Sequence, residues 1–177
     1  MAKILAFAGS NSSTSINHKL IRYTVSSIEN HEVRTINMAN LPFPMFSEDL
    51  EKSEGYSNSL IELKNDIQKS DALIISVNEH NGHPSAYFKN VLDWLSRLER
   101  KFLADKKVLL MSTSMGKRGG IGSLSVVGDM LPRFGAEVVA TFSLPSFGET
   151  FSGELGIVEE ALAKRHHEAL QTFLKML

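Results

Sequence analysis

Short, continuous apolar runs recur along this chain and are separated by segments with a helical pattern. The clearest runs are residues 4–8, 72–77 and 107–113, and two weaker ones cover 32–37 and 137–142. A continuous apolar run of this length is typical of a strand that is buried on both faces of a parallel sheet. The pattern therefore predicts five strands.

Between these runs, apolar residues return every three or four positions, which predicts amphipathic helices. The predicted helices cover 15–29, 57–69, a segment that begins at Pro84 and continues through Leu95, 122–134, and the C-terminal stretch from Val158 to Leu177. Pro84 is expected in the first turn of its helix, where a fixed φ is tolerated. Segment 38–56, which contains two prolines, is expected to be a long loop.

Strands that alternate with helices need right-handed crossovers and give a parallel sheet with helices on both faces. We therefore predict an α/β fold with an open, doubly wound, five-stranded parallel sheet. The length of 177 residues fits one domain, 1–177. In such sheets ligands bind beyond the carboxyl ends of the strands. The loops after strands one, three and four are expected to meet there.

The loop after the first strand has the composition of an anion site. It reads Gly9-Ser10-Asn11-Ser12-Ser13-Thr14-Ser15 and runs directly into a predicted helix. Hydroxyl groups and free backbone N–H groups at a helix N-terminus bind phosphate, and the helix dipole assists them. No lysine follows in the manner of a nucleotide-triphosphate loop. A single terminal phosphate held by neutral donors, as in flavin mononucleotide (FMN), is the ligand that this loop predicts.

Composition narrows the chemistry. The formal net charge is −1 and the chain has no cysteine. The charge gives no cluster of basic residues that would bind nucleic acid. Without cysteine, thiolate chemistry and disulfides are excluded, so any redox chemistry would belong to a cofactor. The six histidines have no ligand spacing, so no metal site is expected. No apolar run approaches the ~20 residues that span a bilayer, and the first strand starts at once, so a cytoplasmic protein without membrane contact is expected.

Three motifs at the strand ends carry a resemblance to a known family. The first loop matches a Gly-Ser-x-Arg-x-x-Ser-x-Asn pattern through Gly9, Ser10, Ser15 and Asn17. The third strand is followed by Glu79, Asn81 and Gly82 and then by Lys89, Asn90, Asp93 and Trp94, and the fourth by the segment from Ser114 to Gly120. Together the motifs resemble those of the NADPH-dependent FMN reductase family of flavodoxin-like proteins, which includes quinone, azo-dye and chromate reductases. Ser12 stands where the family often has arginine, Asn78 replaces a proline and His80 replaces a tyrosine.

The resemblance implies a flavodoxin-like fold, with the five strands of the sheet in the order 2-1-3-4-5, and an FMN-dependent oxidoreductase with NADPH or NADH as hydride donor. The flavin would carry the chemistry, so no catalytic side chain is expected. Acceptors would be quinone-like, azo, flavin or other small electrophiles, and the protein would be a homodimer or homotetramer. The expected cofactor-binding residues are Ser10, Ser12, Ser15, Ile16, Asn17, Asn78, Glu79, His80, Asn81, Gly82, Ser114, Gly116, Gly119 and Gly120.

Two other functions stay open on the sequence. A flavodoxin-like electron carrier would exchange electrons with a protein partner, although the net charge of −1 fits poorly with the acidic character of such carriers. A flavin-binding redox sensor or scaffold without NAD(P)H turnover would carry the same loops. The sequence does not identify the physiological acceptor or choose between NADH and NADPH.

Several side chains near these motifs have two interpretations. His80 and His83 are either proton donors to a reduced acceptor or hydrogen-bonded loop residues. Lys117 and Arg118 either steer anionic ligands or are solvated. The aromatic residues of the long loop, Phe43, Phe46 and Tyr56, are candidates to cover a cofactor or a partner subunit. Trp94 is expected in the core or at a dimer contact, and Asp93 is expected to pair with Arg97 one helical turn on.

Overall fold

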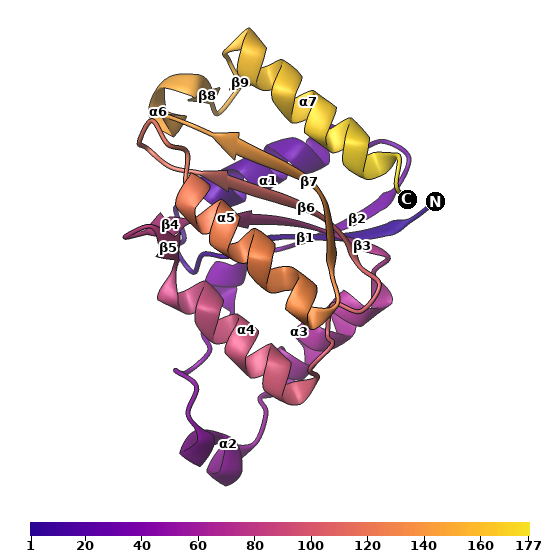
Figure 1. The fold of residues 1–177 in the computed structure, drawn as a ribbon, viewed down its shortest axis with the longest axis vertical. Helices are drawn as coiled ribbons and strands as arrows, with labels where there is room; N and C mark the ends of the chain where they lie inside the picture. Colours follow the sequence, from indigo (N-terminus) through magenta and orange to yellow (C-terminus); the bar gives the residue numbers. More distant parts are fainter.

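The central element of the computed structural model, which describes all residues from Met1 to Leu177, is a parallel sheet (Figure 1). Its strands are β1 (Lys3–Ala8), β2 (Glu32–Ile36), β3 (Ala72–Val77), β6 (Lys107–Thr113) and β7 (Glu137–Leu144). They lie in the order β2-β1-β3-β6-β7. Because β6 and β7 are the fourth and fifth strands of this sheet, the predicted order 2-1-3-4-5 and the flavodoxin-like fold are confirmed.

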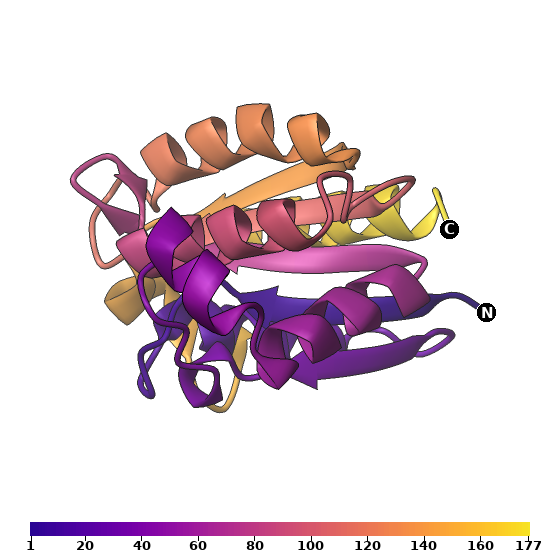
Figure 2. The same cartoon turned by 90° about the horizontal axis from the view of Figure 1, so that it is seen from below.

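Helices cover both faces of the sheet (Figures 1 and 2). One face packs against α1 (Ile16–Ser26) and α7 (Glu160–Leu174), and the other against α3 (Asn58–Lys69), α4 (Ala86–Leu98) and α5 (Ile121–Met130). Successive strand residues enter opposite layers: Leu5 and Phe7 join the core under α3, α4 and α5, whereas Ile4 and Ala6 join the core under α1 and α7. This two-residue period explains why the strands read as unbroken apolar runs. No helix is long and apolar enough to cross a membrane.

The first helix is shorter than predicted. It ends at Ser26, three residues before the expected end, because the backbone N–H of Ser27 turns back to the carbonyl groups of Thr24 and Val25. The helix expected over 122–134 is divided into α5 and a 3₁₀ turn at Leu131–Phe134.

Segment 38–56 is not the continuous loop that the sequence predicts. It contains a 3₁₀ turn at Met38–Asn40 and the helix α2 (Glu48–Glu54), which projects at the lower end of Figure 1. The Ser47 hydroxyl accepts from the Leu50 N–H at the start of α2, and Gly55, with φ of 69°, ends it. These are ordinary helix start and stop signals. Because two prolines stand shortly before these signals, the sequence pattern indicated a loop instead of a helix.

The prediction that Pro84 starts a helix is wrong. Pro84 belongs to a two-stranded hairpin of β4 (Glu79–His80) and β5 (His83–Pro84). Asn81 and Gly82 form its turn with φ values of 53° and 80°, as an Asn-Gly type I′ turn requires. The helix α4 begins only after Ser85, whose hydroxyl accepts from the Phe88 N–H.

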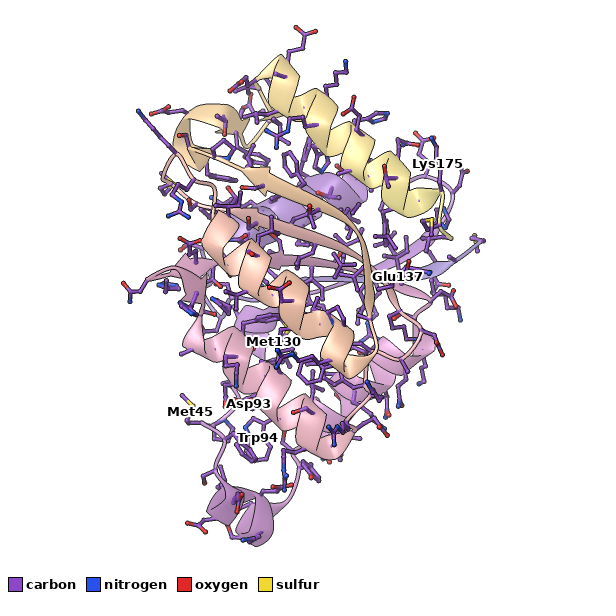
Figure 3. All side chains as sticks on the ribbon, in the orientation of Figure 1. Met45, Asp93, Trp94, Met130, Glu137 and Lys175 are labelled. Carbon is purple, nitrogen blue, oxygen red and sulfur yellow. The ribbon has the colours of Figure 1, made fainter.

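The aromatic residues of the long segment pack onto α4. The Trp94 indole donates to the Pro44 carbonyl oxygen at 2.8 Å, and the rings of Phe46 and Tyr56 lie edge-on to Trp94. Figure 3 shows Trp94 and Asp93 on α4 beside the segment that carries Met45 and leads to α2. Trp94 is 4% exposed, so it is a core residue of this part of the fold, as expected.

The expected pair of Asp93 with Arg97 does not form. Asp93 pairs instead with Lys89 at 2.5 Å, one turn earlier on α4. Arg97 pairs with Glu51 of α2 at 3.0 Å, and Tyr56 also donates to that carboxylate. Hydrogen bonds from Tyr56 and then Arg97 lower the pKa of Glu51. These contacts attach α2 to the body of the molecule.

Between β7 and α7 the chain forms further short elements that the sequence did not predict. They are α6 (Phe147–Thr150) and a hairpin of β8 (Phe151–Ser152) and β9 (Gly156–Ile157). Tyr23 of α1 lies against Gly156, where a Cβ atom would come within 2.0 Å of its ring. The hairpin is thereby fixed against α1.

Candidate functional site

A cleft of about 290 Å³ opens at the carboxyl ends of β1, β3 and β6. The loops after these strands converge there, as the topology of a doubly wound sheet requires. The residues that line it are Ser10, Ser12, Thr14, Ser15, Ile16, Asn17, Asn78, Glu79, His80, Thr113, Ser114 and Met115. Nine of the expected cofactor-binding residues are therefore brought together.

The first wall begins at Gly9, which has no room for a side chain. A Cβ atom there would lie 2.6 Å from Cδ2 of Phe88 in α4. The Gly9 N–H donates to the Ser76 carbonyl oxygen, and its own carbonyl oxygen accepts from the Ser85 hydroxyl, both at 2.9 Å. Close packing against α4, and not a left-handed backbone, is thus the reason for glycine at this position.

The serine hydroxyls of the first loop organise the loop by accepting from its backbone. Ser10 Oγ accepts from the Ser12 N–H at 3.3 Å, Ser12 Oγ from the Thr14 N–H at 3.3 Å, and Ser15 Oγ from the His18 N–H at 3.2 Å. Each of these hydroxyls accepts through its oxygen and also has a proton that it can donate. Ser12 Oγ lies 3.2 Å from Thr14 Oγ1, and either hydroxyl of this pair can be the donor, which leaves one proton of the pair for a ligand. The loop is therefore a set of neutral donors.

Backbone donors add to this set at the start of α1. The N–H groups of Ile16 and Asn17 have no acceptor within the chain, and they lie at the positive end of the helix dipole. No lysine or arginine lines the cleft. An anion placed here would be held by hydroxyls, N–H groups and the dipole.

Asn17 contributes its side chain to the structure of the cleft. The side chain is 1% exposed, and its amide bridges the ends of two strands. Asn17 Nδ2 donates to the Thr113 carbonyl oxygen at 3.1 Å, while Oδ1 accepts from the Thr113 N–H at 3.1 Å and from the Ser76 hydroxyl at 2.7 Å. The side chain is therefore a brace beneath the cleft, and only its backbone N–H is available to a ligand.

The second wall is the segment Asn78 to His80. Asn78 Nδ2 lies 3.0 Å from His80 Nε2, while Asn78 Oδ1 is buried without a partner. The carboxylate of Glu79 is directed away toward α5, where Oε2 accepts from the Ser123 N–H at 3.0 Å. The only carboxylate in the lining is thus engaged with the start of α5 and not with the anion cradle at α1.

Five of the expected residues do not line the cleft. Asn81 and Gly82 form the tip of the hairpin, and Gly116 also lies outside the lining. Gly119 and Gly120 are buried with positive φ, and the Gly119 carbonyl oxygen accepts from Ser112 and Ser143. These two glycines shape the third loop from inside.

Three lining residues were not predicted: Thr14, Thr113 and Met115. Thr113 ends β6 directly before the third loop, so its position at a strand end was a usable signal. Met115 is 67% exposed and lies against Gly148, where a Cβ atom would come within 2.8 Å of Met115 Cε. Nothing in the local sequence marks it.

The lining is polar and contains no lysine or arginine, which suits a phosphate ester held by neutral donors. Donors concentrate at the α1 end, and amide, imidazole and hydroxyl groups lie at the other two walls. The sequence model of the NADPH-dependent FMN reductase family matches residues 2–149. The chain belongs to this family. The match contains all three loops of the cleft and ends before β8, so the β8–β9 hairpin and α7 lie outside it.

Curated relatives of this family member include quinone reductases. The chain is 36% identical over 77 residues to the quinone reductase of Escherichia coli strain K12, which covers 44% of this chain and 41% of the relative. It is 30% identical over 124 residues to the NADPH:quinone oxidoreductase of Arabidopsis thaliana, which covers 68% of this chain and 62% of the relative. The aligned parts thus span less than two thirds of either relative.

Solved structures support the fold over the full chain. FerB, a flavoenzyme NAD(P)H:(acceptor) oxidoreductase from Paracoccus denitrificans, superposes with a TM-score of 0.80 at 22% identity, covering 99% of this chain and 96% of FerB. The apo form of an NADH:FMN oxidoreductase (EMOB) also gives 0.80, at 23% identity, covering 100% and 90%. At these identities the likeness establishes the fold.

Proposed function

We propose that this protein is an FMN-dependent NAD(P)H oxidoreductase that passes a hydride equivalent from a nicotinamide nucleotide to a small electrophilic acceptor. The observation that carries the proposal is the cleft at the strand ends, where an anion cradle and two polar walls meet. Family membership supports the same function. A quinone-like acceptor has the most support, because two curated relatives are named for quinones. Azo compounds and free flavin are further candidate acceptors.

The residues of the cleft fit FMN. Ser10, Ser12, Thr14 and Ser15, with the N–H groups at the start of α1, would hold the phosphate. The walls formed by 78–80 and 113–115 would border the ring. Asn78 Oδ1, buried and unpartnered, is an acceptor that a donor of the ligand would satisfy. Bound FMN would supply the centre that accepts and releases hydride.

The residues of the chain would position the cofactor and the substrates. Neutral donors at the cradle stabilise a phosphate without adding a fixed cation, and backbone N–H groups near the ring would stabilise negative charge that develops there. Met115 and His80, both exposed at the mouth, are placed to contact an incoming substrate. No side-chain nucleophile is required.

Assembly and location belong to the same proposal. We propose a homodimer or homotetramer built from one flavodoxin-like domain per chain, acting on small molecules and without nucleic acid or membrane partners. A cytoplasmic location is consistent with an intracellular hydride donor and with the lack of cysteine. Sedimentation analysis would test the assembly directly.

One preparation tests the proposed activity. The purified protein is mixed with FMN, freed of excess flavin, and its visible spectrum is recorded before and after NADPH or NADH is added without oxygen. The proposal expects a yellow protein that either nucleotide bleaches, and recovery of colour when a quinone is added. A protein that does not retain FMN contradicts the proposal. A yellow protein that neither nucleotide bleaches would instead be an electron carrier or a flavin-binding sensor.

A further inference from the structure

The helix α5, which follows the third loop of the cleft, begins without a cap of its own. Its N-cap residue is Gly120, in a left-handed conformation, and no side chain of the loop accepts from the first turn. The first N–H groups of a helix need an acceptor from outside the helix. Here the acceptor comes from 44 positions earlier in the chain: Glu79 Oε2 accepts from the Ser123 N–H at 3.0 Å.

The contact between Glu79 and α5 requires that position 122 has no side chain. A Cβ atom on Gly122 would lie 2.8 Å from Glu79 Oε2 and 2.9 Å from the Gly82 carbonyl oxygen. The carboxylate and the hairpin turn can therefore reach the first turn of α5 only because glycine stands there. A carboxylate at this end of a helix is also stabilised by the helix dipole.

We propose that Glu79 is a positioning residue that caps α5 and thereby ties the second wall of the cleft to the third. Glu79 lies between Asn78 and His80, which line the cleft, so its anchor fixes the backbone that carries them. The same anchor fixes the N-terminus of α5 and, with it, Gly119 and Gly120 of the third loop. This role concerns the Glu79 side chain, and the backbone of segment 79–82 stays a candidate for the cofactor contact that the family resemblance implies.

The anchor is tested on the protein without added flavin, by amide hydrogen exchange followed residue by residue with NMR. Glu79→Ala is expected to raise exchange at Ser123 and in the hairpin 79–84 by about tenfold, because a hydrogen bond to a charged acceptor is lost. Exchange in β6 is expected to stay unchanged. Glu79→Gln, whose side-chain oxygen can still accept from Ser123, is expected to restore most of the protection.

Two further variants test whether the contact itself causes the change in exchange. Gly122→Ala leaves the carboxylate in the chain but blocks its approach, so it is expected to reproduce the local change of Glu79→Ala. Glu62→Ala, which removes an exposed carboxylate of α3 that has no ion pair, is the matched control and is expected to change nothing. Unchanged exchange at Ser123 in Glu79→Ala, or an equal rise throughout β6, overturns the proposal.

The consequence for the cofactor rests on the proposed function and is measured separately. When FMN is titrated and flavin fluorescence is followed, Glu79→Ala is expected to raise the Kd about tenfold and Glu79→Gln much less. An unchanged Kd in Glu79→Ala, beside an altered exchange pattern, overturns the claim that the anchor shapes the cleft. If the parent protein itself binds no FMN, the proposed function fails, and the exchange pattern alone decides whether Glu79 anchors α5.

Discussion

The Asn17 side chain and the Thr113 backbone form a two-sided hydrogen bond, with both N···O distances at 3.1 Å. This contact joins the start of α1 to the end of β6, which are 96 positions apart in sequence. Ser76 at the end of β3 adds a third bond at 2.7 Å. One buried amide at the start of α1 therefore holds together two of the strand ends on which the cleft is built, those of β3 and β6.

Replacing Asn17 with alanine is expected to destabilise the protein by about 3 kcal/mol, because buried groups of Thr113 and Ser76 lose their partner. Asn17→Asp is expected to be at least as harmful, since a carboxylate oxygen would face the Thr113 carbonyl oxygen. Urea unfolding measures both effects. Asn58→Ala, at an exposed position of α3, is the control, and a loss for Asn17→Ala no larger than for this control would contradict the assigned role.

The phosphate cradle can be strengthened or weakened by single residues. Ser12→Arg adds a cation that can form a charge-assisted bond to phosphate, so we expect FMN to bind about tenfold more tightly. Ser10→Ala combined with Ser15→Ala removes two donors and is expected to release FMN. Fluorescence titration gives the Kd of each variant.

Loss of Ser15 also removes the N-cap of α1, which is worth about 1 kcal/mol of stability, so unfolding of the double variant is measured in parallel. Ser59→Ala, on the exposed surface of α3, is the control for serine removal. If all variants hold FMN as the parent does, the phosphate lies elsewhere.

Acid stability is expected to depend on His166, a residue of α7 that is 3% exposed and faces the core. Its Nε2 lies 2.8 Å from the Thr24 hydroxyl, and that hydroxyl donates its proton to the Leu20 carbonyl oxygen. Burial lowers the pKa of His166 to about 4, and the neighbouring His167 adds to the shift. The folded protein thus keeps this imidazole neutral where an unfolded chain, with a pKa of 6.5, takes up a proton.

The stabilising contribution of neutral His166 is complete above about pH 6.5 and falls as the pH drops toward about 4, by on the order of 3 kcal/mol. His166→Gln is expected to remove this part of the pH dependence, whereas His167→Gln, at an exposed position, is expected to keep it. Urea unfolding at several pH values between about 4 and 7 gives the free energy of unfolding at each pH, and hence its slope against pH. If the free energy of unfolding has the same slope against pH in the parent and in His166→Gln, protonation of His166 is not the cause of the acid sensitivity.

The contact of Gly9 with Phe88 predicts a compensating pair of substitutions. Gly9→Ala places a methyl group 2.6 Å from the Phe88 ring and is expected to cost about 1–3 kcal/mol of stability. Phe88→Leu alone is expected to be destabilising as well, but the double variant is expected to lose less than the sum of the two. A double-mutant cycle by thermal unfolding gives the coupling. Strict additivity would show that the two residues do not compete for space.

Local sequence patterns determined the sheet of this protein and the place of its cleft. The runs at 72–77 and 107–113 coincide with β3 and β6 because strands buried on both faces need apolar side chains at every position. Alternation with helices then required a parallel sheet, in which the loops after the strands lie at one edge, whereas the strand order came from the family resemblance. The serine-rich loop was recognisable because its donors are consecutive in sequence.

The tertiary structure decided how individual side chains are used. Glu79 belonged to a motif, yet its carboxylate caps a helix that begins 42 positions later. Asn17 braces β6 instead of contacting a ligand with its side chain, and Arg97 pairs with Glu51 of α2 instead of its helical neighbour Asp93. These choices depend on distances between residues far apart in the chain, and a hydrogen bond or ion pair forms with the partner that the packed elements bring within reach. Periodicity could assign each residue to an element and a face, whereas only the packing of the elements could select its partner.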